Sequence, residues 1–141
     1  MRRLIVLAAL ALCGCGGSEK EPGTPTLTPD VAGNFSQPLD ARGAAPAWGL
    51  KIRGQQLTLD RPNQPDLVGV APGASIQPHA AEWTARLPDG RTMKVSLYVS
   101  PCADATTGVN YPFAAEVLLP DSTPLDGCAG RPAGAPATAK R

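Results

Sequence analysis

Hydrophobic and polar residues alternate through the middle of the chain with the two-residue period that is typical of β-strands. Apolar side chains stand at every second position in residues 48–52 and again in residues 57–59. The dipeptide Arg53-Gly54 lies between the two runs and is a turn sequence. The pattern therefore predicts a hairpin over residues 46–60.

A short third strand is predicted over residues 66–70, and the clearest hairpin of the chain follows at residues 83–99. Its turn is Pro88-Asp89-Gly90, in which Gly90 can adopt a positive φ. Every second side chain of its two strands is predicted to face inward, and these are Trp83, Ala85, Leu87, Met93, Val95, Leu97 and Val99.

Two further strands are predicted at residues 113–119 and 125–129, and no stretch shows the 3.6-residue apolar period of a helix. The fold class is therefore all-β: a small antiparallel barrel or sandwich of about six to seven strands, an arrangement that removes or shortens exposed sheet edges. A domain of this size gains little net stability from hydrophobic burial alone, so a covalent cross-link is expected.

The first 15 residues have the three-part layout of a bacterial lipoprotein signal. Two arginines precede an unbroken apolar run over residues 4–12, and Leu12-Cys13-Gly14-Cys15 matches the lipobox. The run would rise only about 13 Å as a helix, too little to cross a hydrocarbon core of about 30 Å. We expect cleavage before Cys15 and acylation of Cys15, which would anchor the protein to a lipid bilayer. An ordinary secretory signal is one alternative, and Cys13 is a second candidate for acylation, although Leu12 before it is a poor small residue.

The composition divides the chain into four parts. Residues 1–14 are the predicted signal peptide, and residues 15–39 are the lipidated cysteine and a Pro-, Gly- and Thr-rich flexible linker. Residues 40–129 are the β-domain, and residues 130–141 are predicted to be a disordered tail. Gly16 stands where an Asp would retain a lipoprotein at the inner membrane, so we expect the outer membrane, with the domain facing the periplasm.

The charge balance excludes electrostatic binding to polyanions. The chain has 13 basic and 12 acidic residues, and loss of Arg2 and Arg3 with the signal would leave a net charge near −1. No nucleic-acid partner is therefore expected. The 15 glycines and 16 prolines also disfavour long helices.

Two cysteines remain after the signal region, Cys102 and Cys128. In an oxidising compartment the default for such a pair is a disulfide, which should contribute roughly 3 kcal/mol in the chain-entropy model. A metal site is disfavoured because no histidine cluster accompanies the pair, and the long spacing excludes a C-x-x-C redox motif. A free catalytic thiol is the least favoured alternative.

The sequence offers little catalytic chemistry, and we expect neither an enzyme, a cofactor nor a metal site. The single histidine, His79, is interpreted as an exposed loop residue. Trp48 and Trp83 fall on the inward phase of their strands, which favours core packing over a ligand groove. A polar loop beside Cys102 is the candidate binding loop, and its residues are Asp104, Thr106, Thr107, Asn110 and Tyr111.

Several short motifs resemble a family of uncharacterised bacterial envelope proteins, described as predicted membrane proteins or lipoproteins. They are Trp48-Gly49-Leu50-Lys51-Ile52, Cys102-Ala103-Asp104, Tyr111-Pro112-Phe113 and Leu125-Asp126-Gly127-Cys128-Ala129. The resemblance covers residues 41–130 and supports the β-fold and the disulfide, but it implies no activity. The chain departs from the family pattern at residues 44–47 and 105–107, which puts any ligand role of those positions in doubt.

Two functional hypotheses follow. The first is a membrane-anchored envelope lipoprotein whose domain is a non-catalytic binding or structural module, with an envelope protein or a small molecule as its partner. The second is a periplasmic inhibitor of a hydrolase such as lysozyme or a protease, because a disulfide-pinned loop can enter an active-site cleft.

Overall fold

A computed structural model describes residues 35–133 of the 141-residue chain. The predicted signal peptide, Cys15, most of the linker and the end of the tail lie outside the described residues. Within residues 35–133 there are nine strands, which are β1 (Leu39–Ala44), β2 (Ala47–Arg53), β3 (Gln56–Asp60), β4 (Leu67–Val70), β5 (Ser75–Gln77), β6 (Ala80–Arg86), β7 (Thr92–Ala103), β8 (Asn110–Leu118) and β9 (Pro124–Gly130).

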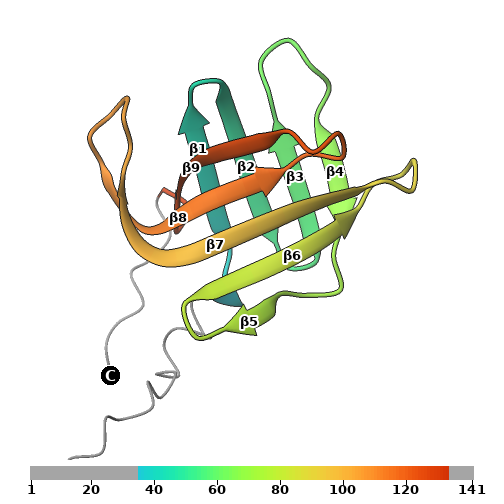
Figure 1. Cartoon of the computed structure of the whole chain (residues 1–141), viewed down its shortest axis with the longest axis horizontal. Coiled ribbons are helices and arrows are strands. Elements are labelled where there is room, and N and C mark those ends of the chain that lie inside the picture. The colour runs from blue at the N-terminus through green and yellow to red at the C-terminus, as the bar shows by residue number, and fades with distance from the viewer. Residues whose placement is uncertain (1–34, 134–141) are drawn as a thin grey trace, which may run out of the picture.

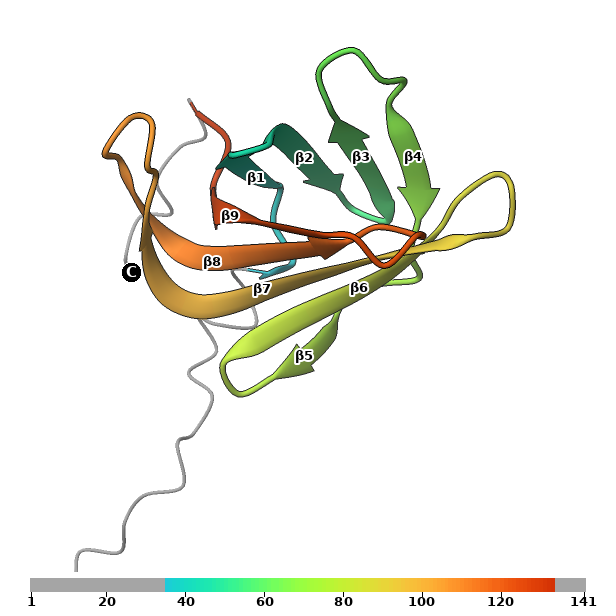
Figure 2. The ribbon, with the colours of Figure 1, turned by 45° about the horizontal axis from the view of Figure 1, so that its top comes forward.

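Eight of these strands form a closed antiparallel barrel, and the ninth lies outside it (Figure 1). The order around the barrel is β4-β3-β2-β1-β9-β8-β7-β6. The ring is completed by one residue pair between β4 and β6, Val70 with Arg86. The outside strand, β5, pairs only with β6 (Figure 2).

The prediction of an all-β antiparallel domain is confirmed, and the structure resolves the alternatives in favour of the barrel. The predicted number of strands was too low, because β1 and β5 were not recognised. β1 has the sequence LDARGA, which contains a glycine at its fifth position and follows a proline-rich segment. β5 has three residues, all of them exposed, so it shows no alternation of apolar and polar positions.

The core fills the barrel interior with the inward-facing side chains of every wall strand. Its largest fully buried members are Trp83, Leu39, Leu50, Leu57, Leu59, Met93, Leu97, Val95 and Val117. Phe35 precedes β1 and is buried against two other rings, with centroid distances of 6.2 Å to Trp83 and 4.9 Å to Phe113. Because Phe35 and Leu39 are buried, the folded part begins within the segment predicted to be linker.

Val99 is not buried, although it keeps the predicted inward phase of β7 and stands in register with buried Phe113 of β8. It is 41% exposed, and the register of β7 against β8 shifts between Val99 and Cys102. The end of β7 is bent at this irregularity, as its curved ribbon shows (Figure 1). An alternation pattern cannot reveal such a bulge, since the inserted residue changes the face of every later side chain.

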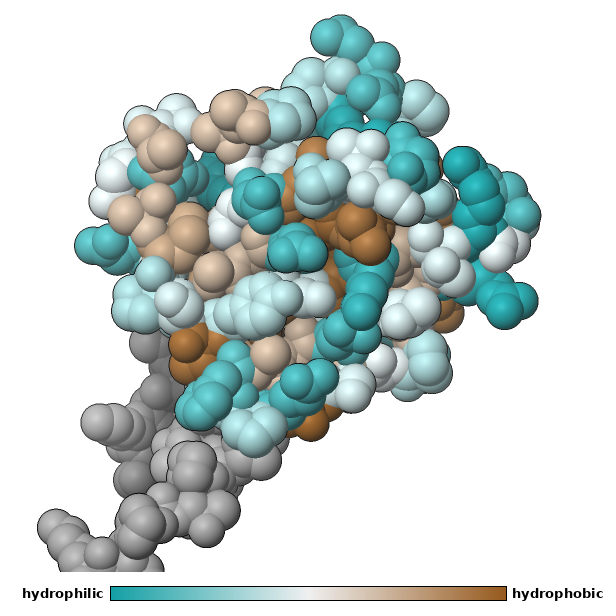
Figure 3. All heavy atoms as spheres, in the orientation of Figure 1, coloured by the Kyte–Doolittle hydropathy of each residue, from teal (hydrophilic) through white to brown (hydrophobic). Residues whose placement is uncertain are grey.

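The exposed large hydrophobic residues are distributed over several elements. They are Val68, Val70, Ile76, Tyr98, Val99 and Val109. On the face seen in Figure 3, hydrophilic and hydrophobic residues are intermingled over the surface. This distribution is ordinary for a protein surface, to which apolar atoms contribute more than half of the accessible area.

Trp48 packs at the junction of β1 and β9 because two glycines make room for it. Its indole N–H donates a hydrogen bond of 3.3 Å to the carbonyl oxygen of Asp126. A Cβ added at Gly43 would meet the Trp48 Nε1 and would lie 2.5 Å from the carbonyl oxygen of Asp126. A Cβ added at Gly127 would collide with the carbonyl oxygen of Arg42 and would lie 2.9 Å from the Trp48 ring. Both glycines therefore permit the close approach of these strands.

We expect the substitution Gly127→Ala to lower the free energy of unfolding by about 2–3 kcal/mol, because the added methyl group must displace backbone on β1. The matched control is Gly49→Ala on β2, where an added Cβ has no atom within 4 Å. That control should change stability by no more than about 0.5 kcal/mol. Urea unfolding followed by tryptophan fluorescence measures both, and equal stability of the two variants would contradict this packing.

Candidate functional site

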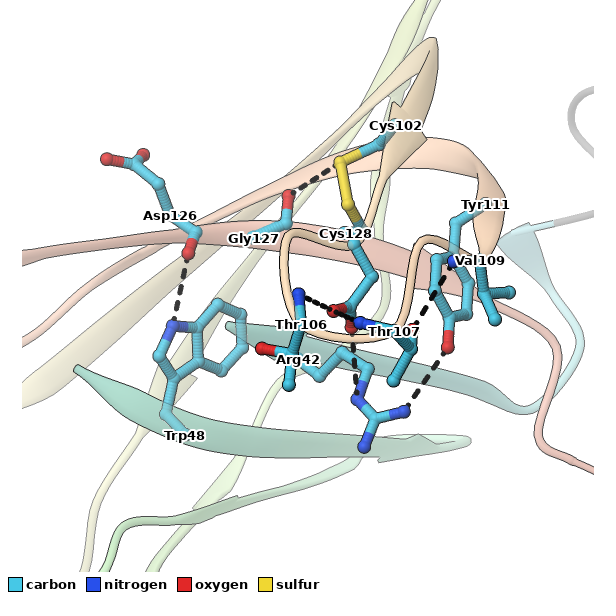
Figure 4. The surroundings of a disulfide bond; sticks show 11 residues. Arg42, Trp48, Cys102, Thr106, Thr107, Val109, Tyr111, Asp126, Gly127 and Cys128 are labelled. Atoms are coloured by element: carbon cyan, nitrogen blue, oxygen red, sulfur yellow. Dashed lines mark hydrogen bonds and ion pairs between the residues drawn. A yellow bond between two sulfur atoms is a disulfide. The ribbon is translucent and has the colours of Figure 1, made fainter. Parts of the chain in front are cut away.

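The ends of β7 and β8 form a hairpin tip, residues 103–110, that is fixed to the outer face of the barrel. Cys102 and Cys128 form the predicted disulfide, with a Cα–Cα distance of 5.5 Å. Cys128 lies on β9, in register with Arg42 of β1 on one side and with Ala114 of β8 on the other. The disulfide therefore joins the hairpin tip to the wall of the barrel where β9 meets its two neighbours (Figure 4).

Inside the hairpin tip, one carboxylate organises the backbone. Asp104 accepts hydrogen bonds from the backbone N–H groups of Thr106 at 2.7 Å and Thr107 at 3.0 Å. The N–H of Gly108 donates to the Asp104 carbonyl oxygen at 2.8 Å, and Gly108 has a φ of 70°. The N–H bonds from Thr107 and Thr106, with a smaller contribution from Arg42, lower the pKa of Asp104 below its usual value. Asp104 is therefore a structural residue of the turn.

Arg42 links the hairpin tip to β1. Its Nη1 group donates a hydrogen bond of 3.3 Å to the hydroxyl of Tyr111, and its Nε lies 3.6 Å from a carboxylate oxygen of Asp104 (Figure 4). The Tyr111 ring and Pro112 cover Gly130, where an added Cβ would lie 3.1 Å from the ring and 3.2 Å from the proline. A disulfide, an ion pair and this stacked contact thus hold the tip in one position.

Beside the hairpin tip, a groove of about 810 Å³ runs over the outer face of β1, β2 and β3. The β3–β4 loop and the end of β3 form one wall, with Asp60, Pro62 and Asp66. The hairpin tip and the segment after β9 form the other, with Val109, Tyr111, Arg131 and Ala133. The floor contains outward-facing residues of the three strands, among them Arg42, Gly49, Lys51 and Thr58.

Gly49 lies at the centre of this floor and keeps it open. In the cross-strand register it stands between Arg42 on β1 and Asp60 on β3. A Cβ at Gly49 would meet nothing within 4 Å, so the space above its backbone is empty. Two residue pairs further along, Lys51 stands between Asp40 and Thr58. The groove therefore has a bare backbone centre that is flanked by charged side chains.

The structure divides the predicted binding loop into two roles. Tyr111 contributes to the groove wall, whereas Asp104, Thr106 and Thr107 are engaged in the hydrogen bonds of the hairpin tip. Asn110 is exposed at the start of β8, where it pairs with Ala103. The groove floor could not be recognised from the sequence, because a glycine has no side-chain functional group. The only sequence hint was Gly49 within an alternating strand, a position that often allows the close approach of a ligand.

The other candidate residues lie away from this groove or serve the core. Trp48 and Trp83 are buried, as predicted, and His79 is exposed in the connection between β5 and β6. Within residues 35–133, no three His, Cys, Asp or Glu side chains are grouped closely enough to hold a metal ion. The same residues contain no helix that is both long and apolar enough to span a bilayer.

Comparison with known proteins returns no match: no protein-family model matches the chain, and neither a curated protein nor a solved structure is significantly similar to it. Function is therefore inferred from the geometry of the groove and of the hairpin tip. The motifs that resemble those of the envelope proteins come close together in the fold. Their residues at the junction of β1 and β9 are Trp48, Tyr111, Gly127 and the disulfide-bonded Cys102 and Cys128.

Replacing both Cys102 and Cys128 by alanine should lower the free energy of unfolding by roughly 3 kcal/mol, because the disulfide closes a long loop in the unfolded chain. Urea unfolding of the variant and of the oxidised parent measures the difference. Non-reducing mass analysis after treatment with iodoacetamide provides the control. Alkylation of both cysteines in the native, unreduced protein would contradict the disulfide.

Proposed function

We propose that the protein is an envelope lipoprotein that is anchored by an acylated Cys15, and that its barrel is a non-catalytic binding module. The anchor is supported by the signal pattern of residues 1–15. The Cys102–Cys128 disulfide supports a location outside the cytoplasm, since such bonds form and persist in oxidising compartments. The outer membrane, with the domain facing the periplasm, is the proposed site of anchoring because Gly16 follows the acylated residue.

The main support for a binding function is the groove beside the hairpin tip. Its volume of about 810 Å³ is within the range of pockets that hold small ligands. Its floor belongs to three paired strands of the barrel, and one wall belongs to a hairpin that is fixed by a disulfide. A site built on such rigid elements needs little ordering when a ligand binds, which favours affinity.

The anchor is tested by the substitution Cys15→Ser, which removes the only thiol at the proposed cleavage site. We expect the variant to lose its acyl chains, to remain unprocessed and to carry no thioether-linked lipid by mass spectrometry. Cys13→Ser is the matched control and should be acylated and cleaved like the parent. A Cys15→Ser protein that is processed and lipidated as before would contradict the proposal.

The groove is tested by the substitution Gly49→Trp, which places a large ring in the empty space above the floor. In a small-fragment screen by NMR, the parent should show fragments whose binding shifts the amide resonances around Gly49. The variant should lose these shifts and keep its stability within about 0.5 kcal/mol. Thr84→Trp, on the exposed outer face of β6, is the control and should retain them. A parent protein that binds no fragment in the groove would contradict the binding function.

Inhibition of a hydrolase is the second candidate, and one observation favours it. The hairpin tip carries Val109, which is 50% exposed, on a turn that the disulfide and Asp104 hold in place. A pinned, projecting turn of this kind can enter a cleft without losing conformational entropy. Slowing of a muramidase or protease that is lost in Val109→Asp but kept in Gly49→Trp would assign the function to the tip rather than to the groove.

A further inference from the structure

The charges on the two sides of the groove differ in sign, with two exceptions: Asp40 on β1, which is ion-paired with Arg53, and Lys51 on the floor. Arg42 lies on β1 and Arg131 follows β9, so both belong to the side of the hairpin tip. Asp60 ends β3 and Asp66 lies in the β3–β4 loop, so both belong to the opposite wall. The groove therefore has a cationic side and an anionic side, with the bare backbone of Gly49 between them.

We infer that the groove binds a short extended peptide by its two charged ends, with the carboxylate toward Arg42 and the ammonium toward Asp60. The inference rests on the proposed binding function and specifies the ligand of the same site. A ligand with a single positive or negative charge would use only one of these two sides. A ligand with both charges satisfies both sides at once.

The cationic side retains hydrogen-bond donors for a carboxylate. The contacts of Arg42 with Tyr111 and Asp104 use its Nη1 and Nε atoms and not Nη2, and its side chain is 54% exposed. These contacts also hold the guanidinium in place, which lowers the entropy that is lost when it binds an anion. Lys51 is exposed on the floor beside it and makes no ion pair with any residue in 35–133.

The anionic side has two exposed carboxylates that take part in no ion pair of the barrel in residues 35–133. Neither Asp60 nor Asp66 makes an ion pair within the described part of the chain, and both are exposed. Asp40, the third carboxylate of the groove, differs because Arg53 binds it at 2.6 Å. An ammonium group entering the groove therefore finds two unpaired carboxylates on the wall opposite Arg42.

The separation of the charges sets the length of the ligand. Arg42 and Asp60 stand on either side of Gly49 in register, so two interstrand spacings, or about 10 Å, separate their backbones. An extended peptide spans about 3.3–3.6 Å per residue, so three residues cover this distance. A free amino acid, whose two charges lie on neighbouring atoms of one residue, is too short to reach both sides.

Four probes that differ only in their end groups test the inference. They are trialanine, its N-acetyl form, its C-terminal amide and the form blocked at both ends. We expect trialanine to shift the amide resonances of Gly49, Lys51 and Asp60 in the purified protein and to bind about three- to fivefold more tightly than either singly blocked form. The doubly blocked peptide and free alanine should bind most weakly.

The substitution Asp60→Asn separates charge recognition from a merely structural effect. In this variant the preference for trialanine over its N-acetyl form should disappear, while the preference over the amide should remain. Glu116→Gln, a carboxylate change on the outer face of β8 away from the groove, should retain both preferences. Equal binding of all four peptides, or tighter binding of a singly blocked form or of free alanine, would overturn the inference. The fragment screen with Gly49→Trp would still decide the broader binding function.

Discussion

The barrel depends on the pairing of its first strand with its last. β1 meets β9 over only three residue pairs, Asp40 with Gly130, Ala41 with Ala129 and Arg42 with Cys128. The partners are separated by almost the whole domain in sequence, so this junction closes a very long loop at a considerable cost in chain entropy. The Cys102–Cys128 disulfide, the Trp48–Asp126 hydrogen bond and the contacts of Arg42 all lie at the junction and offset that cost. The same contacts place one wall and part of the floor of the groove.

Much of the fold could be predicted from the sequence because each wall strand has one buried and one exposed face. The alternating apolar positions of β2, β3, β6 and β8 all face the core as expected, and Gly54 and Gly90 adopt the positive φ of their turns. β1 and β5 were missed for a different physical reason. A strand with a glycine among its few inward positions, or one with no buried side chain, takes its structure from neighbouring strands and not from its own pattern.

The candidate site could be predicted only in part, because the residues that form it are far apart in the sequence. The loop beside Cys102 was a candidate because of its polar side chains. The side chains of Asp104 and Thr107, however, accept hydrogen bonds from backbone N–H groups of their own turn. The groove combines residues of three strands and two loops whose proximity exists only after the barrel closes. Gly49 contributes by the side chain that it lacks, and its place within an alternating strand is the one mark of that role in the sequence.

The groove lies on the outside of a barrel whose interior is filled with side chains. Ligands held inside a barrel must wait for loops or strands to part before they enter or leave. A molecule seated over Gly49 would exchange with solvent by movements of long surface side chains, which occur in picoseconds to nanoseconds. Residence time would then be governed by the ligand's own contacts, and the wall of the barrel would remain closed through every cycle of capture and release.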